Sequence, residues 1–316
     1  MNHINFFKNK TQILSLLSLG YLLSGFTSTS SFQIDVKNLQ ITPKTIYGTD
    51  NRTEAVKSSK LTLAKSTVAL IDSSMMYQDE NYLKNKKTNF YRTNFKTEFN
   101  LCSNQKFLTQ PVIAFCSGSL IGKNLVLTAG HCITNEEECQ NARFVFDYRM
   151  SSGGLNPTST VEANLYSCKK IVSSQFGDKI NYTIVELDRD VVNRTPIQLE
   201  LNSDLAVNEA VFMIGHPSGL PTKVIPTGVV RTTQPEYFIS NLDGFGGNSG
   251  SPIFNKYNRQ VGVLVKGPEE VLTDYYEDNV NFCVKTKICK ANECAGEKAT
   301  NVKAIFNNLP AIALPF

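Results

Sequence analysis

Short apolar runs separated by turn-forming residues dominate the chain from Cys102 onward. The runs are only three to five residues long, which suits strands better than helices. Gly122-Lys123-Asn124 lies between two of them and is typical of a hairpin turn. About ten strands over roughly 200 residues predict an all-β fold of two small barrels. The runs are 119–121, 125–128, 144–146, 182–185, 210–214, 223–225, 228–230, 237–239 and 261–265.

The start of the chain has the pattern of a secretory signal peptide, which we place at residues 1–27. Lys8 and Lys10 precede an apolar run at 13–23, followed by small and polar residues. A membrane anchor is the alternative, but this run is shorter than the roughly 20 residues that span a bilayer. Residues 28–65 are polar and predict a propeptide or linker.

The remainder, residues 66–316, predicts one folded domain in three parts. The first barrel is expected at about 66–194, with a first strand at 67–71 and a polar insertion at 72–100. The second barrel is expected at about 195–285. A cysteine-rich segment with a short helix should occupy 286–316, because residues 297–308 have helical spacing at Val302, Ile305 and Phe306.

Eight cysteines all lie behind the expected signal peptide. An even number in an exported chain predicts disulfides, and therefore a secreted or periplasmic protein. Zinc is disfavoured because no Cys-x-x-Cys pair occurs and the chain has three histidines. The net charge of +4 includes two leader lysines, which leaves too little positive charge to suggest nucleic acid or an anionic membrane as a partner.

A serine in a run of glycines, Asn241–Pro252, is the strongest candidate for chemistry. Glycines let backbone N–H groups point at a developing oxyanion, so Ser249 is a candidate nucleophile. A serine also needs a base, and the candidates are the three histidines: His3, His131 and His216.

Two motifs resemble those of the chymotrypsin-like serine proteases. Leu127–Cys132 is similar to that family's Thr-Ala-Ala-His-Cys motif, with Gly130 in place of the second alanine, and Gly247–Pro252 matches Gly-Asn-Ser-Gly-Ser-Pro of many bacterial members. Residues 100 to 305 resemble secreted bacterial trypsin-like peptidases, which also have a segment similar to the one around His216.

The resemblance implies two six-stranded antiparallel β-barrels with a short C-terminal helix. It implies His131 as general base, Ser249 as nucleophile and the N–H groups of Gly247 and Ser249 as the oxyanion hole. It also implies a disulfide between Cys116 and Cys132. His216 would be structural, in a turn of the second barrel.

The third member of the implied triad departs from the family. The family places an aspartate where this sequence has Asn181, at the head of an apolar strand. Three interpretations stay open: Asp178 substitutes for the aspartate, Asn181 accepts through its carbonyl as in Cys-His-Asn sites, or the protein is a weak or inactive protease.

The resemblance gives a weaker indication of which substrate residue the protein would recognise. Asp243 stands six residues before Ser249, where trypsin-like members place the acidic floor of their specificity pocket, so cleavage after Arg or Lys is expected. A turn residue is the alternative. Val265, Lys266 and Gly267 match the pocket-wall strand, which lacks the histidine usual in glutamyl endopeptidases. Trypsin-like activation is not supported, because Asn248 replaces the aspartate that receives the new amino terminus.

We therefore expect a secreted serine endopeptidase that needs no cofactor. Its partners would be protein or peptide substrates, without stable membrane insertion, and it would act as a monomer. A pseudoprotease that binds proteins is the alternative from another class, and a structural or adhesive protein is a third.

Overall fold

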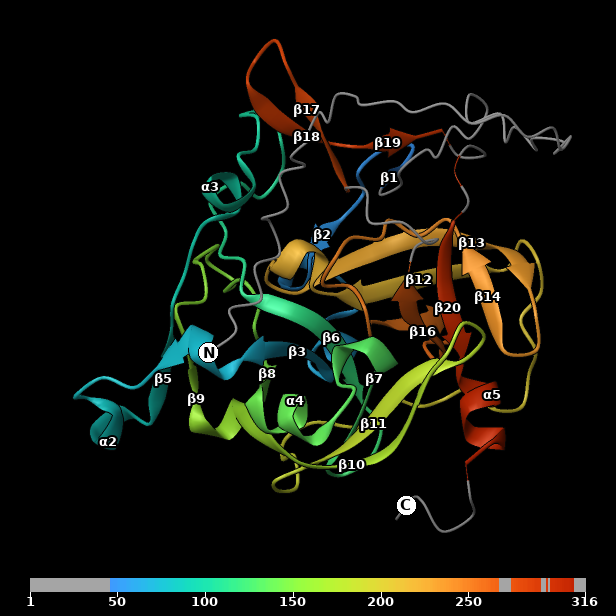
Figure 1. Cartoon of the computed structure of the whole chain (residues 1–316), viewed down its shortest axis with the longest axis horizontal. Helices are drawn as coiled ribbons and strands as arrows, with labels where there is room; N and C mark the ends of the chain where they lie inside the picture. The colour runs from blue at the N-terminus through green and yellow to red at the C-terminus, as the bar shows by residue number, and fades with distance from the viewer. Residues whose placement is uncertain (1–45, 267–273, 291–293, 295, 310–316) are drawn as a thin grey trace, which may run out of the picture. The chain divides into compact units, whose positions relative to one another are not determined.

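Six antiparallel strands form a closed barrel in the first half of the domain (Figure 1). The computed structural model describes residues 46–266, 274–290, 294 and 296–309, so the expected signal peptide and the following residues up to 45 lie outside the described residues. The strand order is β10-β11-β7-β6-β3-β8. Their bounds are Thr67–Asp72 (β3), Ala114–Leu120 (β6), Leu125–Thr128 (β7), Ala142–Phe146 (β8), Leu165–Phe176 (β10) and Asn181–Leu187 (β11).

A second set of six strands also closes into a barrel, because β12 pairs with both β15 and β13. The order around it is β12-β15-β16-β20-β14-β13. The two-barrel antiparallel architecture predicted from the sequence is thus confirmed. The strands are Ala210–Gly215 (β12), Lys223–Thr233 (β13), Tyr237–Ser240 (β14), Pro252–Asn255 (β15), Gln260–Lys266 (β16) and Glu297–Asn301 (β20).

Three expected boundaries in the second barrel were wrong. The runs at 223–225 and 228–230 form one strand, β13, which continues through Pro226. The barrel does not end near residue 285, because β20 inserts between β16 and β14. The C-terminal helix, α5 (Val302–Asn307), is shorter than 297–308 because residues 297–301 pair with two strands, and Asn301 caps the helix by accepting the Lys303 N–H.

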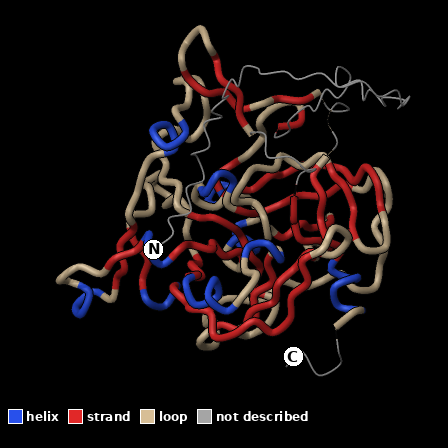
Figure 2. The backbone as a smooth tube through the Cα atoms, in the orientation of Figure 1, coloured by secondary structure: helices blue, strands red, loops and turns tan. Residues whose placement is uncertain are grey.

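The remaining elements are short and connect or cover the barrels (Figure 2). Within the described residues, no helix is long and apolar enough to cross a membrane. These elements are β1 (Ile46–Tyr47), β2 (Thr53–Glu54), η2 (Ala55–Lys57), α1 (Leu61–Ala64), η3 (Ser73–Met75), β4 (Met76–Tyr77), α2 (Tyr82–Asn85), β5 (Lys87–Phe90), α3 (Phe95–Phe99), η4 (Gly130–Cys132), α4 (Glu136–Asn141), β9 (Ser159–Val161), η5 (Glu162–Asn164), η6 (Pro217–Gly219), β17 (Tyr275–Asp278), β18 (Cys283–Thr286) and β19 (Ile288–Cys289).

The barrel interiors are filled by side chains from alternate strand positions. In β3, for example, Val68 and Leu70 point into the core of the first barrel, where they pack with Leu127 of β7. Val302 and Ile305 of α5 join the same core, so this helix packs against the first barrel. The expected insertion at 72–100 contains short elements and buries Phe90 and Phe95.

Residues 46–65, expected to be part of a propeptide or linker, include β2, η2 and α1, which pack on the second barrel. β2 pairs with β13, and Ala55 and Ala64 are buried against Phe212 and Phe254. Whether any of this segment is removed during maturation stays a prediction.

A buried polar cluster holds β2 onto β13. The Lys223 ammonium is fully buried and donates to Gln110 Oε1 at 2.7 Å, to the Pro221 carbonyl at 2.7 Å and to Glu54 Oε2 at 3.2 Å. Gln110 Nε2 in turn donates to Glu54 Oε1 at 2.7 Å. Burial lowers the pKa of Lys223 to about 8, while Glu54 opposes that shift. The three acceptors compensate a buried charge that would otherwise be costly.

All eight cysteines are described, and each is paired. Cys116 bonds to Cys132, and Cys139 of α4 bonds to Cys168 of β10. Cys102 bonds to Cys283, which links the residues after α3 to β18. Cys289 and Cys294 form the fourth disulfide.

We predict that Lys223→Met destabilises the protein by about 3 kcal/mol, because the substitution leaves the Glu54 carboxylate without its buried partner. Urea unfolding followed by fluorescence measures the free energy. The double variant Lys223→Met/Glu54→Gln should recover part of the loss, and a single variant as stable as the wild type would contradict this account of the cluster.

Candidate active site

His131 lies immediately after β7, in the 3-10 turn η4, and is half-buried. The Cys116–Cys132 disulfide fixes this turn to β6, and a ring nitrogen of His131 lies within 4.8 Å of both sulfurs. Phe176, at the end of β10, has its ring centroid 6.5 Å from that of His131 and is 69% exposed. The histidine therefore faces the surface beside an exposed aromatic ring.

Asn181 is the first residue of β11 and lies next to the His131 turn. Its Oδ1 accepts the backbone N–H of Gly130 at 2.6 Å. A backbone N–H can only donate, so the atom facing Gly130 must be the amide oxygen, and the other arm of the amide is the NH₂ group. The main chain of Asn181 is held by Thr300 of β20, whose hydroxyl accepts the Asn181 N–H and donates to its carbonyl.

Gly130 stands where the related motif has alanine, and the structure gives the reason. A Cβ at this position would lie 2.5 Å from the Gln175 carbonyl oxygen and 2.9 Å from Asn181 Oδ1. The β10–β11 hairpin approaches the histidine turn too closely for any side chain at residue 130. Glycine here is a packing requirement.

The loop around Ser249 holds its peptide groups in a defined orientation. The Gly246 carbonyl accepts the Ser218 N–H at 2.6 Å, and the Asn248 carbonyl accepts the Ser251 N–H at 2.8 Å. In a trans peptide the C=O and N–H point in opposite directions, so the N–H groups of Gly247 and Ser249 point away from these partners. Within the described part of the chain, neither N–H donates a hydrogen bond.

Gly247 has a φ of +88°, which favours glycine, and a Cβ there would lie 2.5 Å from the His216 carbonyl oxygen. Ser249 itself is half-buried. Its carbonyl oxygen lies 3.7 Å from Cys132 Sγ, one residue after His131. The loop and the histidine turn therefore meet at this disulfide.

Ser117 of β6, which the sequence analysis did not identify, joins the loop around Ser249 to the first barrel. Its N–H donates to the Ser249 carbonyl at 2.8 Å, and its hydroxyl donates to the Gly247 carbonyl at 2.8 Å. The same hydroxyl accepts the His216 N–H at 3.0 Å. Ser117 is fully buried, and only its place next to Cys116 could have indicated a role.

His216 is fully buried in the turn after β12. Its Nδ1 lies 3.1 Å from the Leu220 carbonyl, so Nδ1 carries the proton, and Nε2 is buried with no partner in the described structure. Burial lowers the pKa of His216 to about 3, so the ring is neutral at pH 7. Its position is that of a structural residue.

Asp178 and Asp243 differ in their surroundings. Asp178 is exposed in the turn between β10 and β11, where its carboxylate makes no hydrogen bond or ion pair with the described residues. Asp243 is only 2% exposed, and its Oδ1 accepts the Tyr47 N–H at 2.8 Å, whereas Oδ2 is buried without a partner among the described residues. Burial raises the pKa of Asp243 to about 6.

The expected pocket-wall residues are only partly described. Val265 is buried and packs in the core of the first barrel together with Val302 and Ile305 of α5. Lys266 ends β16, but its side chain, like Gly267, lies outside the described residues.

Two groups of described residues gather potential metal ligands, and each contains a disulfide. They are Cys116, His131 and Cys132, and Cys102, Asp278 and Cys283. Sulfur in a disulfide is not a thiolate, so neither set fits a metal ion.

Residues 116–263, which include His131, Asn181 and Ser249, match the family model described as a trypsin-like peptidase domain. The matched residues support a chymotrypsin/trypsin-like serine protease family for this part of the chain. A glutamyl endopeptidase of Staphylococcus epidermidis is 24% identical over 189 residues, which cover 56% of this chain and 63% of that relative. The chain thus spans less than two thirds of the length of this relative.

Three solved protease structures cover most of this chain at low similarity. A Glu endopeptidase in complex with MPD has a TM-score of 0.49 and 14% identity, covering 83% of this chain and 95% of that one. The Vibrio cholerae VesB protease has a TM-score of 0.48 and 16% identity, covering 84% and 66%. A scabies mite inactivated protease paralogue has a TM-score of 0.48 and 14% identity, covering 81% and 95%.

We predict that Ser117→Ala slows the reaction of Ser249 with a fluorophosphonate by about tenfold, because the Gly247 carbonyl loses its donor and the neighbouring N–H groups lose their orientation. Ser119→Ala is the matched control, since this buried serine lies on the same strand and its hydroxyl bonds to Leu127 instead. Equal rates for the two variants would refute the role of Ser117.

We also predict that buried His216 destabilises the fold progressively as pH falls. The folded-state pKa lies below the unfolded value, so the unfolded chain binds the extra proton and stability is lost from about pH 6.5 toward pH 3, by at most about 1.4 kcal/mol per pH unit. Asp243 and Asp274, whose pKa values burial raises to about 6, act in the opposite direction below pH 6.

The difference between wild type and His216→Asn isolates the histidine, because the aspartates contribute to both proteins. Urea unfolding at several pH values between 7.5 and 4.5 measures the free energy of unfolding of both proteins. The wild type should be the more stable of the two at pH 7.5, and this difference in free energy should decrease as pH falls. A difference in unfolding free energy that does not change with pH would contradict a neutral buried imidazole.

Proposed function

We propose that the protein is a secreted serine endopeptidase that cleaves peptide bonds through an acyl-enzyme. The observation that carries this proposal is the pair of undonated N–H groups of Gly247 and Ser249, whose peptide groups are oriented by the hydrogen-bonded carbonyls of Gly246 and Asn248. Two such donors stabilise the oxyanion of a tetrahedral intermediate.

In the proposed reaction His131 accepts the proton of the Ser249 hydroxyl while Oγ bonds to the substrate carbonyl carbon. The imidazolium then gives this proton to the leaving amine as the C–N bond breaks. Water, activated by the same histidine, hydrolyses the ester and restores Ser249. No cofactor enters these steps.

Asn181 makes the first proton transfer slow in this proposal. Because its oxygen is engaged by Gly130, the amide has only its NH₂ group left for any further hydrogen bond, and this group can only donate. A donor toward Nδ1 selects the tautomer with the proton on Nε2, which cannot accept the Ser249 proton. Turning the amide around would place two donors, NH₂ and the Gly130 N–H, against each other.

This contact favours the third of the three interpretations of Asn181. An accepting carbonyl would require breaking the 2.6 Å bond to Gly130. Substitution by Asp178 would require an exposed turn residue to move toward the histidine. A protein-binding pseudoprotease is therefore the second candidate, and the Asn181–Gly130 bond is the observation that favours it.

For specificity we propose a basic substrate residue at Asp243. The Oδ2 atom is the one left to receive an ammonium or guanidinium group, because Oδ1 is bonded to Tyr47. Such recognition would weaken below pH 6, where the carboxyl becomes protonated. The name of the staphylococcal relative suggests acidic residues instead, and a peptide library distinguishes the two. Phe176 would contact an apolar side chain next to the cleaved bond.

The four disulfides support a secreted or periplasmic location for the protein. The expected signal peptide at 1–27 belongs to this proposal, as does a monomeric state.

We predict that Asn181→Asp increases the rate of labelling of Ser249 by a fluorophosphonate by about 10²- to 10⁴-fold. A carboxylate can accept from Gly130 with one oxygen and from the histidine with the other, and the reverse change lowers turnover about 10⁴-fold in trypsin-like enzymes. Labelling of the purified full chain, followed by mass spectrometry, measures the rate.

Ser249→Ala is the control and should not be labelled. Slow labelling of the wild type together with fast labelling of the Asn181→Asp variant supports the protease. No labelling of the wild type together with fast labelling of the variant supports the pseudoprotease. If neither form is labelled at Ser249, the assignment of the site fails.

A further inference from the structure

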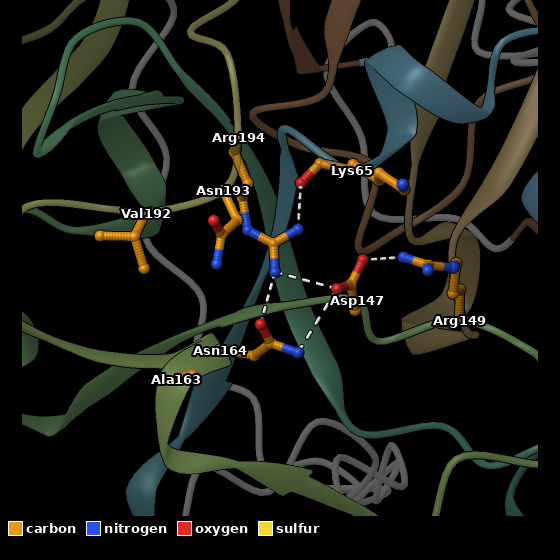
Figure 3. A pocket seen from close by; sticks show the side chains of 8 residues that line it. All are labelled: Lys65, Asp147, Arg149, Ala163, Asn164, Val192, Asn193 and Arg194. Atoms are coloured by element: carbon orange, nitrogen blue, oxygen red, sulfur yellow. Dashed lines mark hydrogen bonds and ion pairs between the residues drawn. The ribbon is translucent and has the colours of Figure 1, made fainter.

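A cavity of about 260 Å³ lies at one end of the first barrel, away from the candidate active site (Figure 3). Its lining includes residues just before β3, just after β8 and after β11. The strand pairings place these at one end of the barrel, since Val68 near the start of β3 pairs with Phe146 at the end of β8. Asn181 instead starts β11 and lies at the opposite end. The lining residues are Lys65, Asp147, Arg149, Ala163, Asn164, Val192, Asn193 and Arg194.

Positive charge exceeds negative charge in this lining. Arg149, Arg194 and Lys65 are basic, whereas Asp147 supplies the one carboxylate. Both guanidinium groups pair with that carboxylate: Arg194 Nη2 binds Oδ2 at 2.9 Å, and Arg149 Nη1 binds Oδ1. A partly desolvated pair of cations that shares one anion favours an additional anion nearby. Burial and the Arg194 charge lower the pKa of Arg149, which agrees with this imbalance.

Arg194 is held rigidly, and one of its donors is unused. Its side chain is 5% exposed, lies 4.8 Å over the Phe146 ring and donates to the Lys65 carbonyl at 2.8 Å and to Asn164 Oδ1 at 2.5 Å. Its Nε is buried and has no partner within the described residues. In Figure 3 the guanidinium lies between Asp147 and Asn193 among the residues that line the cavity.

We propose that this cavity binds a small oxyanion with the chemistry of sulfate or phosphate, with Arg194 Nε as a fixed donor and Arg149 and Lys65 supplying the charge. Its volume is several times the roughly 30 Å³ of a water molecule, so a tetrahedral oxyanion with accompanying water fits. The anion is either a free ion or an ester group on a larger molecule. Binding there is independent of the proposed catalysis and would stabilise the residues that connect the two barrels.

The test is binding of sodium sulfate to the full chain, measured by calorimetry and by the melting temperature, with sodium chloride at equal ionic strength as reference. Sulfate should raise the melting temperature in a saturable way at millimolar concentration, unlike its general salting effect, which grows without saturation. Arg149→Gln should weaken binding about tenfold. The matched control is Arg259→Gln, which removes an arginine that pairs with Glu200 outside the cavity.

Asp147→Asn provides a test of opposite sign, because removing the competing carboxylate should tighten sulfate binding. It also keeps the proposal testable if Arg149→Gln does not fold. Saturable binding that weakens in the first variant and tightens in the second supports the site. Absence of saturable binding, or equal binding by wild type and the cavity variants, overturns it.

The source of the anion is decided by comparing inorganic sulfate, inorganic phosphate and a sulfated oligosaccharide with its desulfated form. Equal affinity for the free ions and the sulfated sugar assigns the cavity to a free ion. Much tighter binding of the sulfated sugar, lost in Arg149→Gln, assigns it to an ester on a larger molecule.

Discussion

Two hydrogen bonds of Ser117 tie the Ser249 loop to the barrel that carries His131, and a third holds the turn at His216. Its N–H and hydroxyl bind the carbonyls of Ser249 and Gly247, and its hydroxyl receives the N–H of His216. Ser117 follows Cys116, whose disulfide fixes the His131 turn. One residue of β6 thus sets the position of groups from both barrels. Because Ser117 is fully buried, this junction is protected from competition with water.

The contrast between the two halves of the site is electrostatic. The Ser249 loop has the undonated N–H groups of Gly247 and Ser249, whereas the described residue beside the His131 turn is an amide, Asn181. Asn181 lies beside the His131 turn and accepts the Gly130 N–H, but an amide has one acceptor oxygen where a carboxylate has two. In the proposed mechanism, this difference of one acceptor limits the transfer of the Ser249 proton to His131.

Local patterns in the sequence predicted the barrel architecture. Leu125–Thr128 and Ala210–Ile214 are apolar runs bounded by turn residues, and both became strands. The strands β10 and β20 were not predicted, because Leu165–Phe176 and Glu297–Asn301 are largely polar. Their extended conformation is stabilised by pairing with neighbouring strands.

Long-range hydrogen bonds could not be predicted either. Nothing local in the sequence connects Ser117 with Gly247, or Tyr47 with Asp243, because each pair meets only after both barrels have closed. Gly130 is an intermediate case. The sequence showed that it departs from the family motif, but the reason, a close carbonyl of Gln175, exists only in the folded hairpin.

The second barrel is built from both ends of the described chain. β2, at residues 53–54, adds to β13, and β20, at residues 297–301, is needed to join β14 to β16. During synthesis this barrel therefore cannot close until almost the whole sequence has been made. Such late closure would leave the strands of the second barrel without their final partners until residues 297–301 are available to pair, so folding of this barrel depends on contacts between residues far apart in the sequence.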